Sequence, residues 1–391
     1  MRRTLIRIAA IVGASLCLTA NATWSQNVAS TPQADRLFEL AESYRTGDGV
    51  LQNYATAAEY YAQAAAVGDA RAMNALGGLY FSGLGVDADA RTGADLVARA
   101  AALGAPKHLH DFATILQNGV GTEADPARAA ELYRQAAEKG WVESAVSLGV
   151  LYLEGQGVDK DIPRAMALFK GPAEAGHVRA QNNLGLIHVR GDGVAQDYEL
   201  AAKWFAKAAE AGLPTAINNL GVMYENGFGV ELDEERAAEL YRLAAQKSGD
   251  DVAQIGVVFD ARLAAADPAS AEAYLAGARA GDPVAQFLLA YLMSTHSELA
   301  DPIGAARLFE AAAERGMPAA MVNLGILSFQ GKGMLQDFSE GYKWLTIAAA
   351  IGFNGAIDLR DQLSGRMTAQ QIESANERAE IEWARLSGSS Q

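Results

Sequence analysis

Cysteine is nearly absent from this chain. There is one cysteine in 391 residues, Cys17, so no disulfide can form within a single molecule. Small exported domains that lack a large apolar core often depend on such cross-links, and that design is excluded here. Half of the residues are hydrophobic and 20% are charged, which is enough apolar material for a fold held together by packing alone.

An excess of basic residues is also lacking. The chain has 32 Lys and Arg against 47 Asp and Glu, which gives a formal charge of -15. Nucleic-acid binding requires clustered positive charge for the phosphates, so nucleic acid is excluded as a partner. Histidine is scarce too, with five residues of which His108 and His110 form the only close pair. On a helix Asp111 shares a face with His108 but His110 does not, so we predict no metal site and no cofactor.

Long apolar runs are missing as well. The apolar run over residues 8–18 is too short to span a bilayer. Three arginines precede it and the small residues Ala20-Asn21-Ala22 follow it, which is typical of a secretory signal peptide. We therefore expect a signal peptide over residues 1–22, cleaved after Ala22, and a linker over 23–33. The mature protein is expected to be periplasmic or secreted, without a membrane span.

Glycine, in contrast, recurs with a near-fixed step of 36 residues. A Gly-x-Gly pair begins at seven positions: Gly47, Gly83, Gly119, Gly155, Gly191, Gly227 and Gly331. A further glycine closes each of nine units: Gly68, Gly104, Gly140, Gly176, Gly212, Gly249, Gly281, Gly316 and Gly352. A repeat length between 20 and 50 residues indicates a solenoid, which offers long surfaces and seldom builds a catalytic pocket.

Each unit reads as two antiparallel helices joined by the glycine turn. In the fifth unit, residues 180–188 and 201–208 space small and apolar residues three or four apart, as two helices would. A short acidic or amide residue stands six positions after the first loop glycine, and we interpret it as the N-cap of the second helix rather than as a catalyst. These positions are Asn53, Asp89, Asp125, Asp161, Asp197, Asp233 and Asp337.

The predicted fold is an all-α, right-handed superhelical solenoid of about nine helix-turn-helix repeats over residues 34–352. Residues 353–391 are expected to form a C-terminal cap helix and a tail, because Thr368 and Gln371 have the spacing of a capping box. Repeats seven and eight, about residues 251–316, lack the Gly-x-Gly loop. That irregularity is open to three interpretations: sequence drift, a hinge, or a specialised docking site.

This pattern resembles the Sel1-like repeat family, which is related to the tetratricopeptide repeat. The resemblance rests on A-x-x-x-L-G-x-x-Y, on G-x-G-V, on the capping Asp, and on an aromatic-x-x-A-A-x-x-G ending; Tyr80, Tyr152 and Tyr224 match the family tyrosine. The family implies scaffolds and adaptors for protein partners. The chain is also similar to periplasmic Sel1-repeat regulators that restrain sensor kinases controlling exopolysaccharide and motility. The resemblance thus implies a non-enzymatic scaffold with a protein or peptide partner in the cell envelope.

Two other functions stay open at this point. One is a cell-wall or polysaccharide-binding envelope factor, for which exposed aromatic platforms would argue. The other is a β-lactamase-like hydrolase, since some Sel1-repeat proteins are described as β-lactamases. The chain contains no Ser-x-x-Lys, Gly-x-Ser-x-Gly or His-Glu-x-x-His, and we predict no catalytic residue and no nucleophile with a base beside it.

Five residues are candidates for partner binding. Asn183, Asn219 and Asn323 occupy the same position, eight residues before a loop glycine. They are either structural amides that bridge to a neighbouring helix or loop, or a polar ladder that grips an extended peptide backbone. His108 stands where other repeats have a small alanine, and with His110 it suggests local repacking or a contact specific to the third repeat.

Overall fold

A computed structural model describes residues 31–191, 193–248 and 255–388, and these residues form only helices, turns and irregular segments. The expected signal peptide lies outside them. The α-helices are α1 (Pro32–Thr46), α2 (Tyr54–Ala66), α3 (Ala70–Ser82), α4 (Ala90–Ala102), α5 (Pro106–Asn118), α6 (Pro126–Glu138), α7 (Val142–Glu154), α8 (Ile162–Glu174), α9 (Val178–Arg190), α10 (Tyr198–Glu210), α11 (Pro214–Asn226), α12 (Glu234–Ser248), α13 (Ala271–Arg279), α14 (Pro283–Thr295), α15 (Pro302–Ala313), α16 (Pro318–Gln330), α17 (Phe338–Ala350), α18 (Ala356–Ser364) and α19 (Ala369–Gly388). Short 3-10 turns lie at η2 (Pro268–Ser270) and η3 (Ser297–Leu299).

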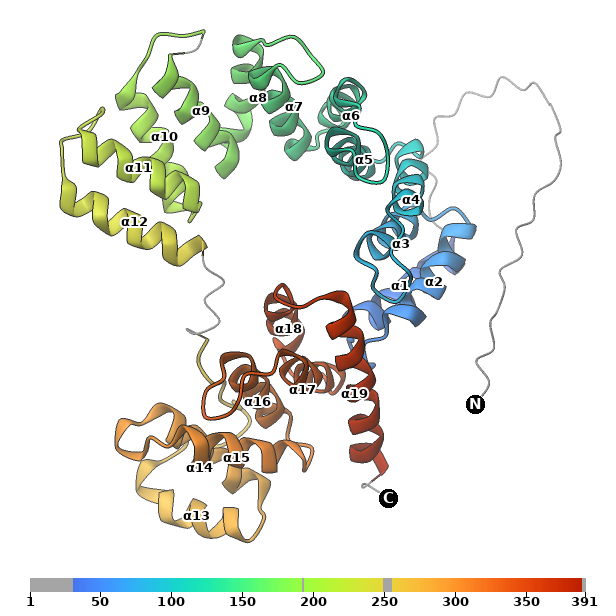
Figure 1. Ribbon diagram of the computed structural model, residues 1–391, viewed down its shortest axis with the longest axis vertical. Helices are drawn as coiled ribbons and strands as arrows, with labels where there is room; N and C mark the ends of the chain where they lie inside the picture. The colour runs from blue at the N-terminus through green and yellow to red at the C-terminus, as the bar shows by residue number, and fades with distance from the viewer. Residues whose placement is uncertain (1–30, 192, 249–254, 389–391) are drawn as a thin grey trace, which may run out of the picture.

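The helices stack as antiparallel pairs along a curved path. Six regular pairs, α1 to α12, follow one arc, and the chain then turns back so that α17, α18 and α19 lie beside the first repeat (Figure 1). The all-α solenoid of about nine units predicted from the sequence is confirmed, with α19 as its terminal helix.

The recurrent acidic residues cap the second helices, as predicted. The side chains of Asn53, Asp161 and Asp197 each accept a backbone N–H from the first turn of the following helix at 2.9 Å. Thr368 and Gln371 close a reciprocal capping box before α19, with N···O distances of 2.8 and 3.2 Å. These groups satisfy donors that every helix start leaves unpaired, so they belong to the scaffold.

The second glycine of each loop makes the contact between repeats. A Cβ at Gly121 would lie 1.9 Å from the carbonyl oxygen of Ala90 at the start of α4, and one at Gly85 would lie 2.2 Å from Tyr54 C at the start of α2. Gly49 has no preceding repeat, and nothing lies within 4 Å of its Cβ position. The loop glycine therefore lets one repeat seat on the second helix of the repeat before it.

A second close approach occurs inside the repeats whose first helix is α3, α7, α9, α11 or α16, whereas α1, α5 and α14 have alanine at the equivalent position. The Leu-Gly pair of the first helix places its glycine against the large residue of the second helix. A Cβ added at Gly185 would fall 2.5 Å from the Phe205 ring, and one at Gly77 would fall 2.8 Å from Val97 Cγ2. Only glycine lets the two helices approach this closely.

Adjacent glycines in α3 provide a matched test. Gly77→Ala should destabilise the protein by about 1–3 kcal/mol, because the new methyl group overlaps Val97 and the carbonyl of Gly93. Gly78→Ala should instead stabilise it by about 1 kcal/mol, because that position is helical, exposed and open. Urea unfolding followed by circular dichroism measures both, and equal effects of the two substitutions would contradict the close approach.

The seventh repeat departs from the pattern. Residues 255–260 form no helix where the first helix of this repeat should be, and only its second helix, α13, is present. The eighth repeat keeps both helices, α14 and α15, and replaces the glycine loop with η3. The irregularity predicted over 251–316 is thus concentrated in its first part.

The chain's two ends meet across the arc. Arg360 of α18 has no exposed surface, and its Nη2 donates to the Thr46 carbonyl at the end of α1 at 2.8 Å. Tyr342 of α17 donates a hydrogen bond to the Gln52 amide oxygen of the first loop. Glu373 of α19 accepts the Gly85 N–H at 3.1 Å. The terminal helices therefore close the superhelix onto its own first two loops.

We predict that Arg360→Met opens this closure. The substitution keeps much of the side-chain stem but leaves the Thr46 carbonyl without its charged donor, and such a hydrogen bond contributes about 1.5–3 kcal/mol. Small-angle X-ray scattering should show a larger maximum dimension at unchanged helicity. Arg190→Met, at an exposed arginine of α9, is the control. An unaltered scattering profile for Arg360→Met would contradict the prediction.

Candidate functional site

Asn323 of α16 holds an extended segment of the chain itself. Its Oδ1 accepts the N–H of Val258 at 2.6 Å, and its Nδ2 donates to the carbonyl of the same residue at 2.9 Å. Two turns further along α16, Gln330 Nε2 donates to the Ile255 carbonyl at 2.7 Å. Asn323 is completely buried beneath this segment. An amide that pairs with both polar groups of one residue satisfies backbone that has left a helix.

The segment is anchored by its apolar side chains as well. Ile255, Val257, Val258 and Phe259 pack against the largest core cluster, which includes Phe287 of α14. The Phe259 ring lies 6.0 Å from the Phe287 ring, centre to centre. This surface of α14 and α16 therefore recognises an extended backbone through amides and its side chains through packing. Sequence reasoning identified Asn323 but missed Gln330 and the identity of the segment.

The equivalent asparagines of the regular arm differ from Asn323. Asn219 Nδ2 donates to Asn182 Oδ1 of the preceding repeat at 2.9 Å, so this amide bridges α9 and α11. Asn183 is half-buried, and no described residue hydrogen-bonds its side chain. The structure thus brings Asn182 and Asn219 together and leaves Asn323 in a separate part of the superhelix. Asn182 was missed, although it is adjacent to Asn183.

The histidines of the third repeat lie between α5 and α7. His110 Nδ1 is 2.8 Å from Ser144 Oγ of α7, and its ring lies 5.2 Å from the Tyr133 ring. We predicted that no nucleophilic side chain lies beside a base, and the distance between Ser144 and His110 contradicts that prediction. Ser144 has no exposed surface, however, so a substrate cannot reach its hydroxyl. The pair bridges two neighbouring helices.

His108 is buried, and its Nδ1 has no hydrogen-bond partner. Burial lowers the pKa of His108, and the nearby Lys107 ammonium lowers it further, while Asp111 opposes the shift. The more distant Asp69 and Arg71 act in opposite directions. The folded protein therefore favours the neutral imidazole.

A pH dependence of stability follows. Because the pKa of His108 is lower in the folded state, the unfolded chain binds the proton more readily, and stability falls as pH drops through the unfolded value of about 6.5. The urea midpoint should decrease between pH 7.5 and pH 5. His108→Gln should reduce that decrease, because the substituted side chain does not titrate. An identical decrease in both proteins would contradict this assignment.

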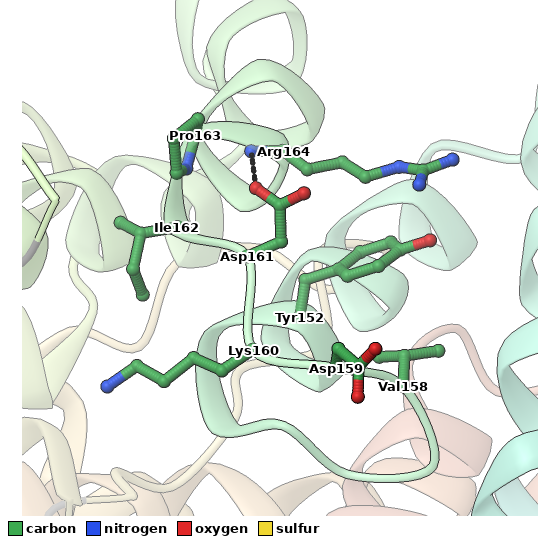
Figure 2. Close-up of a pocket in the computed structure, with 8 residues that line it drawn as sticks. All are labelled: Tyr152, Val158, Asp159, Lys160, Asp161, Ile162, Pro163 and Arg164. Carbon is green, nitrogen blue, oxygen red and sulfur yellow. Dashed lines mark hydrogen bonds between the residues drawn. The ribbon is translucent and has the colours of Figure 1, made fainter.

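A cavity of about 750 Å³ opens at the fourth repeat (Figure 2). It lies between Tyr152 at the end of α7 and residues 158–164, where α8 begins. Asp161 accepts the Arg164 backbone N–H, and the Arg164 guanidinium lies 4.7 Å from the centre of the Tyr152 ring. The carboxylate is thus already used as a helix cap. The same loop and cap recur along the chain, so we assign no chemistry to this cavity.

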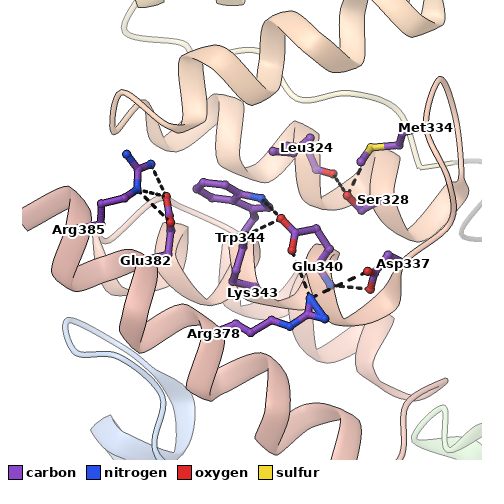
Figure 3. Close-up of polar contacts among 10 residues, drawn as sticks. All are labelled: Leu324, Ser328, Met334, Asp337, Glu340, Lys343, Trp344, Arg378, Glu382 and Arg385. Atoms are coloured by element: carbon purple, nitrogen blue, oxygen red, sulfur yellow. Dashed lines mark hydrogen bonds and ion pairs between the residues drawn. The ribbon is translucent and has the colours of Figure 1, made fainter.

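A second polar cluster joins α17 to α19 (Figure 3). Glu340 accepts hydrogen bonds from Lys343 at 2.5 Å and from the indole N–H of Trp344 at 2.8 Å. Arg378 of α19 lies 3.4 Å from the same carboxylate. These contacts fix the terminal helix on the last repeat and thereby support the closure at Arg360.

Four of the second-helix aromatic residues are too deeply buried to provide a platform for a sugar ring. Tyr61, Tyr133, Phe169 and Phe205 are at most 1% exposed, because the first helix of the next repeat covers them. Within the described residues, no group of three or more His, Cys, Asp or Glu could hold a metal ion. No helix in that part of the chain is long and apolar enough to cross a membrane.

The fold and these surfaces define a helical-repeat solenoid of the interaction-scaffold class. The Sel1 repeat model matches eight segments: 37–69, 70–104, 113–141, 142–177, 178–213, 214–248, 283–317 and 318–353. These cover more than half of the chain, which belongs to the Sel1 repeat family. The unmatched interval 249–282 contains the irregular seventh repeat.

The chain is similar to two solved structures, the first of which supports the same architecture. A Sel1 repeat protein from Oxalobacter formigenes is 28% identical with a TM-score of 0.52, covering 55% of this chain and 88% of that one. A protective antigen of uropathogenic Escherichia coli strains, described as having an SLR fold, is 25% identical with a TM-score of 0.49, covering 90% of this chain and 84% of that one. No curated protein matches the chain. The Sel1-repeat fold indicates a protein-interaction scaffold, and such solenoids are typically non-catalytic.

Proposed function

We propose that this protein is an exported scaffold of the cell envelope that holds an extended segment of a partner protein against the first helices of its repeats. The observation that carries the proposal is the pairing of Asn323 with the N–H and carbonyl of Val258. Here the repeat surface binds an extended backbone within its own chain. The same residue type stands at the same repeat position, in Asn183 and Asn219, on the regular arm.

Asn183 supports a binding role most directly. Its amide is half-buried and free of hydrogen bonds to the described residues, so it can pair with an incoming backbone without breaking an existing contact. Asn219 keeps its Oδ1 as an acceptor while its Nδ2 bonds Asn182. Two amides one repeat apart offer an extended chain a series of polar contacts that do not depend on its side chains.

The proposed compartment rests on the N-terminal sequence. The arginines, the short apolar run and Ala20-Asn21-Ala22 favour export and cleavage. The proposed partner is an envelope protein, and the similarity to periplasmic regulators favours a role in signalling or exopolysaccharide control. N-terminal sequencing of the protein from a periplasmic fraction should begin at Thr23, and an intact N-terminus there would exclude the proposed cleavage.

Photo-crosslinking tests the binding surface. A benzoylphenylalanine at position 183 should yield a discrete adduct with an envelope protein in living cells. The purified partner should then bind the wild-type protein at least about fivefold more tightly than it binds the Asn183→Ala/Asn219→Ala variant, because each lost hydrogen bond contributes about 0.5–1.5 kcal/mol. Isothermal titration calorimetry measures both affinities.

Glu210→Ala, at an exposed position of the second helix α10, is the matched control and should bind like the wild type. Thermal melting of all variants separates binding from stability. If the double variant loses stability and keeps its affinity, the asparagines are purely structural and the proposal is wrong. The absence of any adduct at position 183 would also overturn it.

A further inference from the structure

The regular arm, which is the series of helices α1 to α12, ends at α12. On each earlier second helix of this arm, one face is covered by the first helix of the next repeat. In the regular repeats, except the fourth, which has Met166 in α8, the second helix presents a small residue, then a large residue three positions later, and an alanine four positions after that. The first helix of the next repeat packs on this face: Ile217 and Leu220 of α11 share a core cluster with Phe205 of α10. The equivalents of the small residue are Ala58, Ala94, Ala130 and Ala202, which are 3–5% exposed.

On α12 the same positions are uncovered. Ala238 and Ala245 are exposed, and Tyr241 is half-buried, whereas Phe205 and Phe169 are at most 1% exposed. Residues 255–260, which follow in place of the missing first helix, pack instead on α14 and α16. No described helix therefore takes the position that α11 takes on α10.

A cavity of about 410 Å³ marks this vacancy at the junction of α11 and α12. Asn218 and Asn219 line it from α11, and Tyr241 and Ala245 line it from α12. One repeat earlier, Asn182 stands at the position of Asn218 and accepts a hydrogen bond from the next first helix. Asn218 is exposed, and no described residue hydrogen-bonds its side chain. Asn218 can therefore make the contact between repeats that Asn182 makes, but no described helix supplies its partner.

We propose that this α12 end face, formed by Asn218, Ala238, Tyr241 and Ala245, docks an amphipathic α-helix of a partner protein. The occupant would carry a small residue followed four positions later by leucine, as in Ala216 and Leu220 of α11, with an amide that bonds Asn218. The argument is continuity with an established interface, because each earlier copy of this face within the chain packs against the first helix of the next repeat. The face borders the asparagine surface that accepts an extended segment, because Asn219 also lines the cavity, whereas Asn183 lies one repeat away.

The geometry also specifies how the helix lies. The docked helix would lie beside α11 in the same orientation that α11 has beside α9. Its small residue would lie over Tyr241, and its leucine would lie near Ala244 and Ala245. Tyr241 is held in place, because its hydroxyl donates to Glu225 at 2.7 Å and its ring meets Gly221 of α11. A preorganised aromatic side chain loses little conformational freedom when a partner helix covers it.

The chain supplies its own probe. A peptide of residues 213–227, the sequence of α11, already fits the equivalent face of α10. A short free helix is marginal in water, so the peptide is crosslinked between positions 218 and 222, which are exposed in α11. Fluorescence anisotropy with the full-length mature protein should give saturable binding. Replacing the peptide leucine of position 220 by lysine should weaken that binding at least tenfold.

Two variants of the protein locate the site. Ala238→Glu places a charge in the docked interface and should weaken binding at least tenfold, without affecting the fold because the position is exposed. Arg236→Gln changes the net charge by the same amount on another side of α12 and should leave binding unchanged. Circular dichroism confirms that both variants fold. Absence of peptide binding to the wild type, or equal binding to Ala238→Glu, would overturn the proposal.

Sedimentation velocity distinguishes a second copy of the chain from a partner helix. The wild-type protein should remain monomeric across the concentrations used for the peptide. A dimer that Ala238→Glu dissociates would assign the face to self-association and overturn the proposal of a partner helix. The Asn183→Ala variant, which changes no residue of this cavity, tests the extended-segment surface separately, so failure of either proposal leaves the other intact.

Discussion

The structure depends on one constraint: a repeat cannot bury the large residue of its second helix by itself. Phe205 becomes inaccessible only because α11 of the next repeat covers one side of it and Gly185 of its own first helix lets the other side approach closely. Stability in such an array comes mainly from contacts between neighbours. Wherever the array stops or bends, a face must be covered by something else or remain open to water. The described structure contains examples of both outcomes.

In the seventh repeat, an extended segment rather than a helix covers the neighbouring repeats. Its extended segment leaves the helical path and packs on α14 and α16, where Asn323 satisfies backbone groups that a helix would have paired internally. The C-terminal end is covered by α18 and α19, which also reach the first repeat through Arg360 and Thr46. A solenoid that touches its own beginning is constrained in curvature, so the relative placement of its surfaces is more fixed than in an open array.

The sequence predicts what is local and periodic. Asp197 and Thr368 identify helix starts because a cap and its partner lie within a few residues, and the 36-residue step specifies the stacking. The sequence does not predict contacts between residues that are brought together by the curvature of the many repeats between them. Arg360 and Thr46 are 314 positions apart, and their contact requires the curvature of the whole arc. The His110–Ser144 and Asn182–Asn219 contacts were within reach, since each joins residues of consecutive repeats, but several positions could have met there.

The open face of α12 is an exception to this constraint, because no described helix covers it. Leaving Ala238, Ala245 and one side of Tyr241 in water forgoes roughly 2 kcal/mol of burial, at about 25 cal/mol per Å² of apolar surface. The chain buries the residue equivalent to Tyr241 in each earlier regular repeat and protects its C-terminal end with two additional helices. Its extended segment follows α12 and could in principle have formed the missing helix, yet it is used on another surface. A face built to repeat geometry, with an amide at the position that accepts the next helix, retains the capacity to bind that helix when another molecule provides it.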